Sequence, residues 1–478
     1  MFLRQIFDPY LAQYAYLIGC QRSGEALIID PERDIARYQK VADENGLRIT
    51  AVAETHIHAD FVSGGREFAE DPNIHLYLSA EGGKDWTYQW PGQRPKTHVL
   101  KHGDHFMVGN IRVEAVHTPG HTPEHMSFLI TDLGGGADAP MALTTGDFVF
   151  VGDVGRPDLL ESAAGQKGVM EPSARTLQAS LVERLSPLKD YLQILPAHGA
   201  GSACGKALGA VPTTTLGYER HFNKPLRQAA ADPAGFVKEI LRGQPEPPLY
   251  FATMKRVNRD GIRVTGGVAE ARHLTVQEAK ALIANTEVKV LDSRDSRDAF
   301  SGGHLPRAIH VPLNGPFFSA GAGSYVAEDE KILVIAESQE DAELAAVQLY
   351  RIGLDGLAGW IGFCEWMKAG EEVMKSERIM FSDFDREKLG AQDVILDVRT
   401  TSEFEEGHLP GALSIPYTRL RARLNEVPQG QTLYIHCGSG KRASLASSFL
   451  QAMGFQTIHI DGVCAECERI ASSQGITH

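Results

Sequence analysis

The chain has 478 residues, of which 43% are hydrophobic, enough for two to four domains with well-filled cores. Its 47 basic and 61 acidic side chains give a formal net charge of −14 without a long basic run, which argues against nucleic acid or an anionic membrane as a partner. Neither a signal peptide nor a window near the roughly 20 apolar residues of a spanning helix is present, so we expect a cytoplasmic protein.

The first elements predict one side of a metal site. Apolar runs at 14–19 and 26–31 predict two strands, 35–44 predicts a helix, and 49–53 predicts a buried strand. His56, His58 and Asp60 follow that last strand directly. Two imidazoles and a carboxylate at alternate positions, on a loop held by a strand end, are typical metal ligands.

Three further loops carry the same kinds of side chain. His117 and His121, Asp147, and His198 follow the apolar runs 111–116, 141–143 and 191–195. Each loop is therefore expected at the mouth of a strand. The four loops, in this order, resemble the metallo-β-lactamase fold, a sandwich of two sheets flanked by helices with its metals at one edge.

The resemblance implies two metal positions, and one of them lacks a ligand. A binuclear hydrolase of this fold would place a histidine at position 61, where this chain has Phe61. A phenyl ring cannot bind a metal, which favours a single ion. The residues expected to surround that ion, or to be remnants of the lost position, are His58, Asp60 and His198.

The remaining three side chains are the candidate ligands. His56, His121 and Asp147 leave coordination positions open, an arrangement associated with non-haem Fe(II) and O2. A mononuclear or weakly binuclear zinc hydrolase is the alternative.

An internal repeat follows His273. Residues 290–294 recur as 395–399, and residues 303–308 recur as 407–412, at an offset of about 104 residues, which is the size of one small domain. Each copy predicts a strand, helix, strand succession. We therefore predict a multidomain α/β and α+β chain, with an αββα sandwich at 1–265 and two α/β domains at 272–375 and 378–478.

The second copy carries a candidate nucleophile. Cys437 lies between a strand predicted at 432–436 and a helix beginning near Ala443. The loop's glycines let backbone N–H groups point inward, and the helix N-terminus and Arg442 add positive potential, which makes the thiolate a usable nucleophile toward an anion. The loop and the Asp-x-Arg and His-Leu-Pro motifs resemble rhodanese. The expected substrate-binding residues are Gly438, Ser439, Gly440 and Lys441.

The first copy has lost this chemistry. It places Ala336 where the nucleophile would stand and Asp341 where the arginine would stand. Without a thiolate, and with an added negative charge, it resembles an inactive rhodanese that serves packing or domain placement.

The combination resembles the persulfide dioxygenase–rhodanese fusion proteins. This implies a mononuclear Fe(II) domain without an organic cofactor, which oxidises a low-molecular-weight persulfide such as glutathione persulfide with O2 to sulfite and thiol. Cys437 would interconvert persulfide plus sulfite with thiosulfate plus thiol. The resemblance also suggests that Arg156 binds the thiol's carboxylates. Ala200 stands where some members have a tyrosine, so the sequence does not determine which thiol carries the persulfide.

The other cysteines give weaker signals. Six cysteines are sparse for this length, which favours reduced thiols with individual roles over a disulfide framework. Cys204 is a candidate sulfur relay near the iron site, with a buried small side chain as the alternative. Cys464 and Cys467 form a lone C-x-x-C, compatible with a redox pair or half a metal site.

Two other functions remain open at this point. One is a glyoxalase II-like zinc thioester hydrolase with fused rhodanese domains, and the other is a sulfur carrier that does not use O2. The sequence is compatible with a homo-oligomer but does not determine the oligomeric state.

Overall fold

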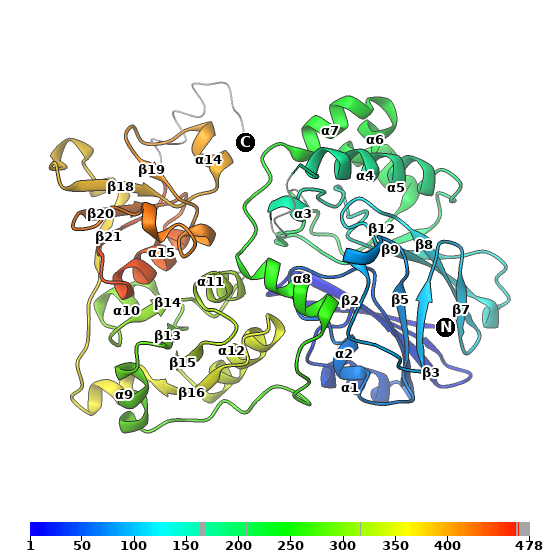
Figure 1. Cartoon of the computed structure of the whole chain (residues 1–478), viewed down its shortest axis with the longest axis horizontal. Helices are drawn as coiled ribbons and strands as arrows, with labels where there is room; N and C mark the ends of the chain where they lie inside the picture. Colours follow the sequence, from blue (N-terminus) through cyan, green and yellow to red (C-terminus); the bar gives the residue numbers. More distant parts are fainter. Residues whose placement is uncertain (163–167, 207, 316, 465–466, 468–478) are drawn as a thin grey trace. The chain divides into compact units, whose positions relative to one another are not determined.

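The computed structural model describes residues 1–162, 168–206, 208–315, 317–464 and 467, and the chain divides into two compact units. The first comprises residues 1–247 and 251–268, and the second comprises 248–250 and the described part of 269–478. Among the described residues, no helix is long and apolar enough to cross a membrane. Figure 1 gives the order of the elements in each unit.

The first unit is built on two six-stranded sheets. The first sheet has, in spatial order, β1 (Phe2–Asp8), β2 (Gln13–Cys20), β3 (Glu25–Ile29), β4 (Arg48–Ala53), β5 (His75–Ser79) and β6 (Thr97–Leu100). The second has β12 (Thr214–Thr215), β11 (Gln193–Pro196), β10 (Ala142–Gly146), β9 (Met126–Asp132), β8 (Ile111–His117) and β7 (His105–Val108).

Strand β2 explains why the sequence reads as continuous apolar runs. Tyr16 and Ile18 join the core between the two sheets, whereas Ala15 and Leu17 join the core on the outer face of the first sheet. A strand buried on both faces cannot alternate between apolar and polar residues.

Helices cover the two outer faces and complete the αββα sandwich. The helices of this unit are α1 (Ala36–Glu44), α2 (Gly65–Phe68), α3 (Leu159–Ser162), α4 (Met170–Leu185), α5 (Leu216–Phe222), α6 (Lys224–Ala231), α7 (Pro233–Leu241) and α8 (Tyr250–Asp260). Apolar residues of α4, α6 and α7 share a core with β10 and β11, and these helices lie together in Figure 1. The predicted fold class is confirmed.

The second unit contains two parallel sheets, as the repeat predicts. The first sheet has the order β14 (Ala308–His310), β13 (Val288–Asp292), β15 (Lys331–Ala336) and β16 (Leu357–Gly362). The second has the order β17 (Glu377–Met380), β21 (Gln456–Asp461), β20 (Thr432–His436), β18 (Asp393–Asp397) and β19 (Leu413–Ser414). Its helices are α9 (Val276–Ala284), α10 (Arg297–Gly302), α11 (Phe317–Tyr325), α12 (Gln339–Arg351), α13 (Phe363–Lys368), α14 (Thr401–Glu406) and α15 (Lys441–Ala452).

Helix α15, which begins inside the cysteine loop, packs on the first copy of the repeat. The His310 imidazole at the end of β14 lies 2.7 Å from the hydroxyl of Ser444, and the Ser448 hydroxyl accepts the His310 backbone N–H at 2.9 Å. The rings of Tyr325 and Phe449 stack with their centroids 4.4 Å apart. The two copies therefore share a core contact through α15.

Tyr16 links the two sheets of the first unit next to a predicted ligand loop. Its buried hydroxyl donates to the Pro196 carbonyl at 2.7 Å and accepts from Gln5 at 2.9 Å.

We predict that Tyr16→Phe lowers the free energy of unfolding by about 1–3 kcal/mol, because a buried carbonyl loses its donor. Urea denaturation would measure this, with the exposed Tyr191→Phe as the control. An equal effect of both substitutions would contradict it.

Candidate metal centre and cysteine loop

The ends of β4, β8 and β10 lead to the loops that bring three predicted ligands together. His56, His121 and Asp147 are all buried, and one ligand atom of each lies within 4.8 Å of the others. The His56 Nδ1 lies 2.9 Å from the Thr55 hydroxyl, and the His121 Nδ1 lies 2.9 Å from the Arg156 carbonyl. These contacts fix the orientation of each ring, as outer partners of metal-bound histidines commonly do.

The chemistry of this group suits a divalent cation. Both Asp147 carboxylate oxygens are buried without a hydrogen-bond partner, and Oδ2 lies 3.3 Å from the His121 Nε2. Burial lowers the pKa of His56 and His121, so both imidazoles are neutral and can bind a metal. A buried carboxylate without a donor needs a cation to offset its charge.

His58 contacts two acidic side chains outside this group. Its Nε2 lies 3.2 Å from a carboxylate oxygen of Asp30 and 3.4 Å from one of Glu54. Although burial opposes a charge here, the two carboxylates hold the pKa of His58 well above its usual value. A protonated imidazole cannot bind a metal, so this arrangement favours a supporting role for His58. The contact with Asp30 could not be predicted from the sequence, because Asp30 follows a different strand, β3.

Asp60 and His198 lie on the other side of Asp147. The His198 Nε2 is 3.4 Å from Asp60 and 3.3 Å from the Asp147 Oδ1. Cys204 joins them, with one ligand atom of each of Asp60, His198 and Cys204 within 4.8 Å of the others. Burial and the adjacent carboxylates raise the pKa of the Cys204 thiol well above its usual value. The position of the missing histidine is filled by the fully buried ring of Phe61.

Arg156 has internal partners. Its guanidinium forms a bidentate ion pair with Asp158 and donates to the carbonyls of Ala203 at 3.0 Å and Pro245 at 2.8 Å. The side chain is 1% exposed. These contacts favour a role in holding three loops together, and binding of substrate carboxylates by Arg156 stays a prediction.

His125 contacts the backbone of one candidate ligand, Asp147. Its Nε2 accepts the backbone N–H of Asp147 at 3.0 Å, and its Nδ1 lies 2.8 Å from the Thr118 hydroxyl. Both ring nitrogens are thereby occupied. The contact of His125 with the Asp147 backbone joins residues from two different loops, so it could not be predicted from the sequence.

Cys437 begins the turn between β20 and α15. The thiol is 1% exposed, and Gly440 adopts a left-handed backbone with φ of 82°. The carbonyls of Ser439 and Gly440 are held by other side chains, Arg297 at 3.0 Å and His459 at 2.9 Å. A turn whose carbonyls are bonded elsewhere can present its N–H groups to an anion. Gly438 lies in the same turn, and Lys441 is the first residue of α15.

Two arginines lie near the loop, and only Arg442 was predicted from the sequence. Arg442 lies in the first turn of α15, where it is paired with Glu403 through two hydrogen bonds of 2.6 and 2.7 Å. Arg297 comes from the first copy of the repeat, and nothing in a sequence links it to a loop 142 residues away. The first copy of the repeat therefore contributes a contact to the cysteine loop of the second.

In the first copy, the corresponding segment is an ordinary helix start. β15 ends at Ala336, and the Ser338 hydroxyl caps α12 by accepting the backbone N–H of Asp341 at 3.1 Å. No thiol stands at this position.

Cys464 and Cys467 are joined by a disulfide, whereas Cys20, Cys204, Cys364 and Cys437 are free. The expectation of reduced thiols is therefore wrong for this pair. Its two Cα atoms lie 5.4 Å apart, which is within bonding range for a disulfide.

The pair of Glu403 and Arg442 gives a pH-dependent prediction. Although burial opposes ionisation, hydrogen bonds from Arg442 and Thr400 lower the pKa of Glu403 to about 2. In the unfolded chain, a glutamate has a pKa of about 4.3. The ionised Glu403 therefore stabilises the fold above that pH, and this stabilisation is lost as the pH falls toward 2. We predict that the free energy of unfolding of the wild type exceeds that of Glu403→Gln above this window, and that the difference shrinks as the pH falls through it. Urea denaturation at a series of acidic pH values would measure this. The exposed Glu405→Gln on the same helix should leave the titration unchanged.

Comparison with known proteins agrees with this architecture. Residues 9–198 match the metallo-β-lactamase superfamily, and residues 275–368 and 384–462 match the rhodanese-like domain. The mitochondrial persulfide dioxygenase ETHE1 of Bos taurus is 32% identical over 200 residues, which is 41% of this chain and 67% of that protein. Its Homo sapiens counterpart is 30% identical over 198 residues, with the same shares.

A solved structure extends the likeness beyond the first unit. The crystal structure of a metallo-beta-lactamase from Staphylococcus aureus subsp. aureus COL is 41% identical, with a TM-score of 0.66, and the match covers 76% of this chain and 99% of that chain. The chain thus belongs to the persulfide dioxygenase family of the metallo-β-lactamase superfamily, fused to C-terminal rhodanese-like domains.

Proposed function

We propose that the first unit is a mononuclear iron dioxygenase that oxidises a low-molecular-weight persulfide, such as glutathione persulfide. The observation that carries this proposal is the buried group of His56, His121 and Asp147, whose carboxylate has no hydrogen-bond donor. The paired state of His58 and the ring of Phe61 favour one ion over two. The relatives named persulfide dioxygenase support the choice of substrate.

The overall reaction balances with water as a reactant. One persulfide, one O2 and one water give one thiol, one sulfite and two protons. His56, His121 and Asp147 would hold one Fe(II), which supplies open coordination positions and passes electrons from sulfur to O2. The protein keeps both imidazoles neutral, orients them through Thr55 and the Arg156 carbonyl, and excludes water from the carboxylate.

We further propose that Cys437 is the nucleophile of a sulfurtransferase. Its thiolate attacks the outer sulfur of a persulfide, the S–S bond breaks, and the thiol leaves with a proton. Sulfite then attacks the sulfur now held on Cys437, which releases thiosulfate and restores the thiolate. Arg442 and the loop amides would hold the anion. Cys204, beside Asp60 and His198, remains the candidate for passing sulfur between the two reactions.

The metal proposal is tested by Asp147→Asn. Anaerobically purified protein should bind about one iron per chain and consume O2 with glutathione persulfide, producing sulfite. Because a carboxylate ligand is lost, the variant should lose at least about 100-fold in O2 uptake, together with most of its iron. His105→Ala, at an exposed histidine on β7, is the control. Two zinc ions per chain with thioester hydrolysis and no O2 uptake would overturn the proposal.

The sulfurtransferase proposal is tested by Cys437→Ser. Thiosulfate exchange should disappear because the nucleophile is gone, while O2 uptake with persulfide should stay within about twofold of wild type, since the metal group is untouched. Cys364→Ser, at an exposed cysteine of the first copy, should change neither activity. Loss of both activities in Cys437→Ser would contradict separate sites.

Arg297 tests the contribution of the inactive copy. Arg297→Ala should lower kcat/KM for thiosulfate exchange by about tenfold, since one charge-assisted hydrogen bond to the Ser439 carbonyl is lost. Arg297→Lys should restore part of this. Arg378→Ala is the matched control, because Arg378 pairs with the same Asp461 without contacting the loop. A similar loss in both alanine variants would assign the effect to Asp461 instead.

A further inference from the structure

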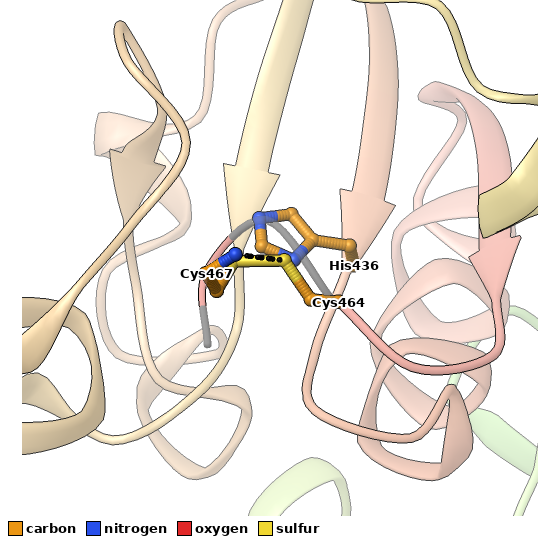
Figure 2. A group of neighbouring side chains, drawn as sticks. All are labelled: His436, Cys464 and Cys467. Atoms are coloured by element: carbon orange, nitrogen blue, oxygen red, sulfur yellow. Dashed lines mark hydrogen bonds between the residues drawn. A yellow bond between two sulfur atoms is a disulfide. The ribbon is translucent and has the colours of Figure 1, made fainter. Parts of the chain in front are cut away.

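The disulfide of Cys464 and Cys467 lies beside the buried imidazole of His436. His436 is fully buried, and neither ring nitrogen has a hydrogen-bond partner among the described residues. One of its nitrogens lies within 4.8 Å of both sulfur atoms, and Figure 2 shows the imidazole beside the disulfide. The Cys467 backbone N–H also points at the Cys464 sulfur, at 3.3 Å.

The surroundings of this group are apolar. The two cysteines share a small core with Ile395 and Leu409, against which Phe381 and Phe384 pack. The charged groups that face the imidazole are Asp397, whose carboxylate lies 3.5 Å from the His436 Nε2, and Arg399, which is paired with that carboxylate. Burial lowers the pKa of His436, although the Asp397 carboxylate opposes this, so the ring is neutral.

A purely structural role would not account for these features. A disulfide that closes a loop of only two intervening residues removes little freedom from the unfolded chain, so it contributes less stability than one that closes a long loop. Burying an imidazole without a partner costs stability instead. The C-x-x-C spacing brings two sulfurs within exchange distance, and an adjacent base would promote formation of the thiolate.

We propose that Cys464 and Cys467 form a redox-active dithiol–disulfide site whose substrates are low-molecular-weight thiols and persulfides, with His436 as its proton acceptor. The site is distinct from the nucleophile, yet His436 directly precedes Cys437 in the chain. The thiol half of the cycle is independent of the proposed function, whereas the persulfide half rests on it.

Both halves balance. In reduction, a thiol attacks one sulfur of the pair, the disulfide bond breaks, and the other cysteine leaves as a thiolate that is protonated. A second thiol then releases the first cysteine, so that two thiols become one disulfide and the pair gains two electrons. In oxidation, one cysteine thiolate attacks the outer sulfur of a persulfide, the persulfide S–S bond breaks, and the thiol leaves. The second cysteine then attacks the sulfur of the first, which closes the disulfide and releases the outer sulfur as hydrogen sulfide. His436 takes the proton in this direction and returns it in the other.

The reductive half is tested on the full chain with glutathione alone. The protein is held anaerobically in stepped ratios of reduced to oxidised glutathione, quenched in acid, alkylated and analysed by peptide mass spectrometry. We expect Cys464 and Cys467 to gain label together, as a two-electron couple, without unfolding of the chain. Cys364 serves as the internal control, since it should be labelled at every ratio.

Two results would overturn the proposal. A pair that is labelled only after denaturation is a structural disulfide. A pair that is labelled from the start, with one zinc ion released per chain on alkylation, is a metal site.

The oxidative half uses reduced, anaerobic Cys437→Ser protein, so that neither O2 nor the rhodanese nucleophile consumes the persulfide. Glutathione persulfide should release about one hydrogen sulfide per chain and close the pair, and the additional substitutions Cys464→Ser and Cys467→Ser should abolish this. Failure of the dioxygenase alone would leave this result unaffected. Absence of sulfide release, with the pair still reduced, would overturn the persulfide half.

The role of His436 is read from rates. His436→Asn should slow the reduction of the disulfide by glutathione, followed by alkylation of the cysteines, at least about tenfold. The ratio of the wild-type rate to the variant rate should depend on pH as the imidazole titrates. An equal rate at every pH would overturn its assignment as the proton acceptor.

Discussion

The constraint on which the first unit depends is the charge of one buried carboxylate. Asp147 is completely buried, and neither of its oxygens accepts a hydrogen bond from the described part of the chain. Leaving a negative charge in this state is costly unless a cation offsets it. Burial keeps His56 and His121 neutral, and His125 fixes the backbone of Asp147 itself. The surrounding loops thus form a site suited to a cation.

The nearby His58 shows how the same constraint is met in a second way. There, Asp30 and Glu54 hold the pKa of the imidazole well above its usual value, so a protonated ring lies beside them, and burial raises the pKa of Glu54. The His58 group therefore contains its own cation, whereas neither oxygen of Asp147 accepts a hydrogen bond from the described residues. This difference, rather than the number of histidines, favours a single ion.

Much of this could be predicted from the sequence because strand ends and ligands lie close together in the chain. The loops after β4, β8 and β10 bring His56, His121 and Asp147 together as their positions after apolar runs suggested. What could not be predicted depends on contacts between distant segments. The donors of Arg156 are taken by an adjacent aspartate and two remote carbonyls, and the loop around Cys437 is held by Arg297 from another domain. The spacing of Cys464 and Cys467 indicated their proximity but not their oxidation state.

The packing of α15 on the first copy of the repeat has a consequence for truncated forms of this chain. The helix that follows the cysteine loop contacts His310 and Tyr325 of the first copy. A fragment that contains only the second copy would uncover the ring of Phe449 and remove the imidazole that lies beside the Ser444 hydroxyl. The first copy, which has no thiol at the position of Cys437, thus supplies part of the surface on which the second copy packs.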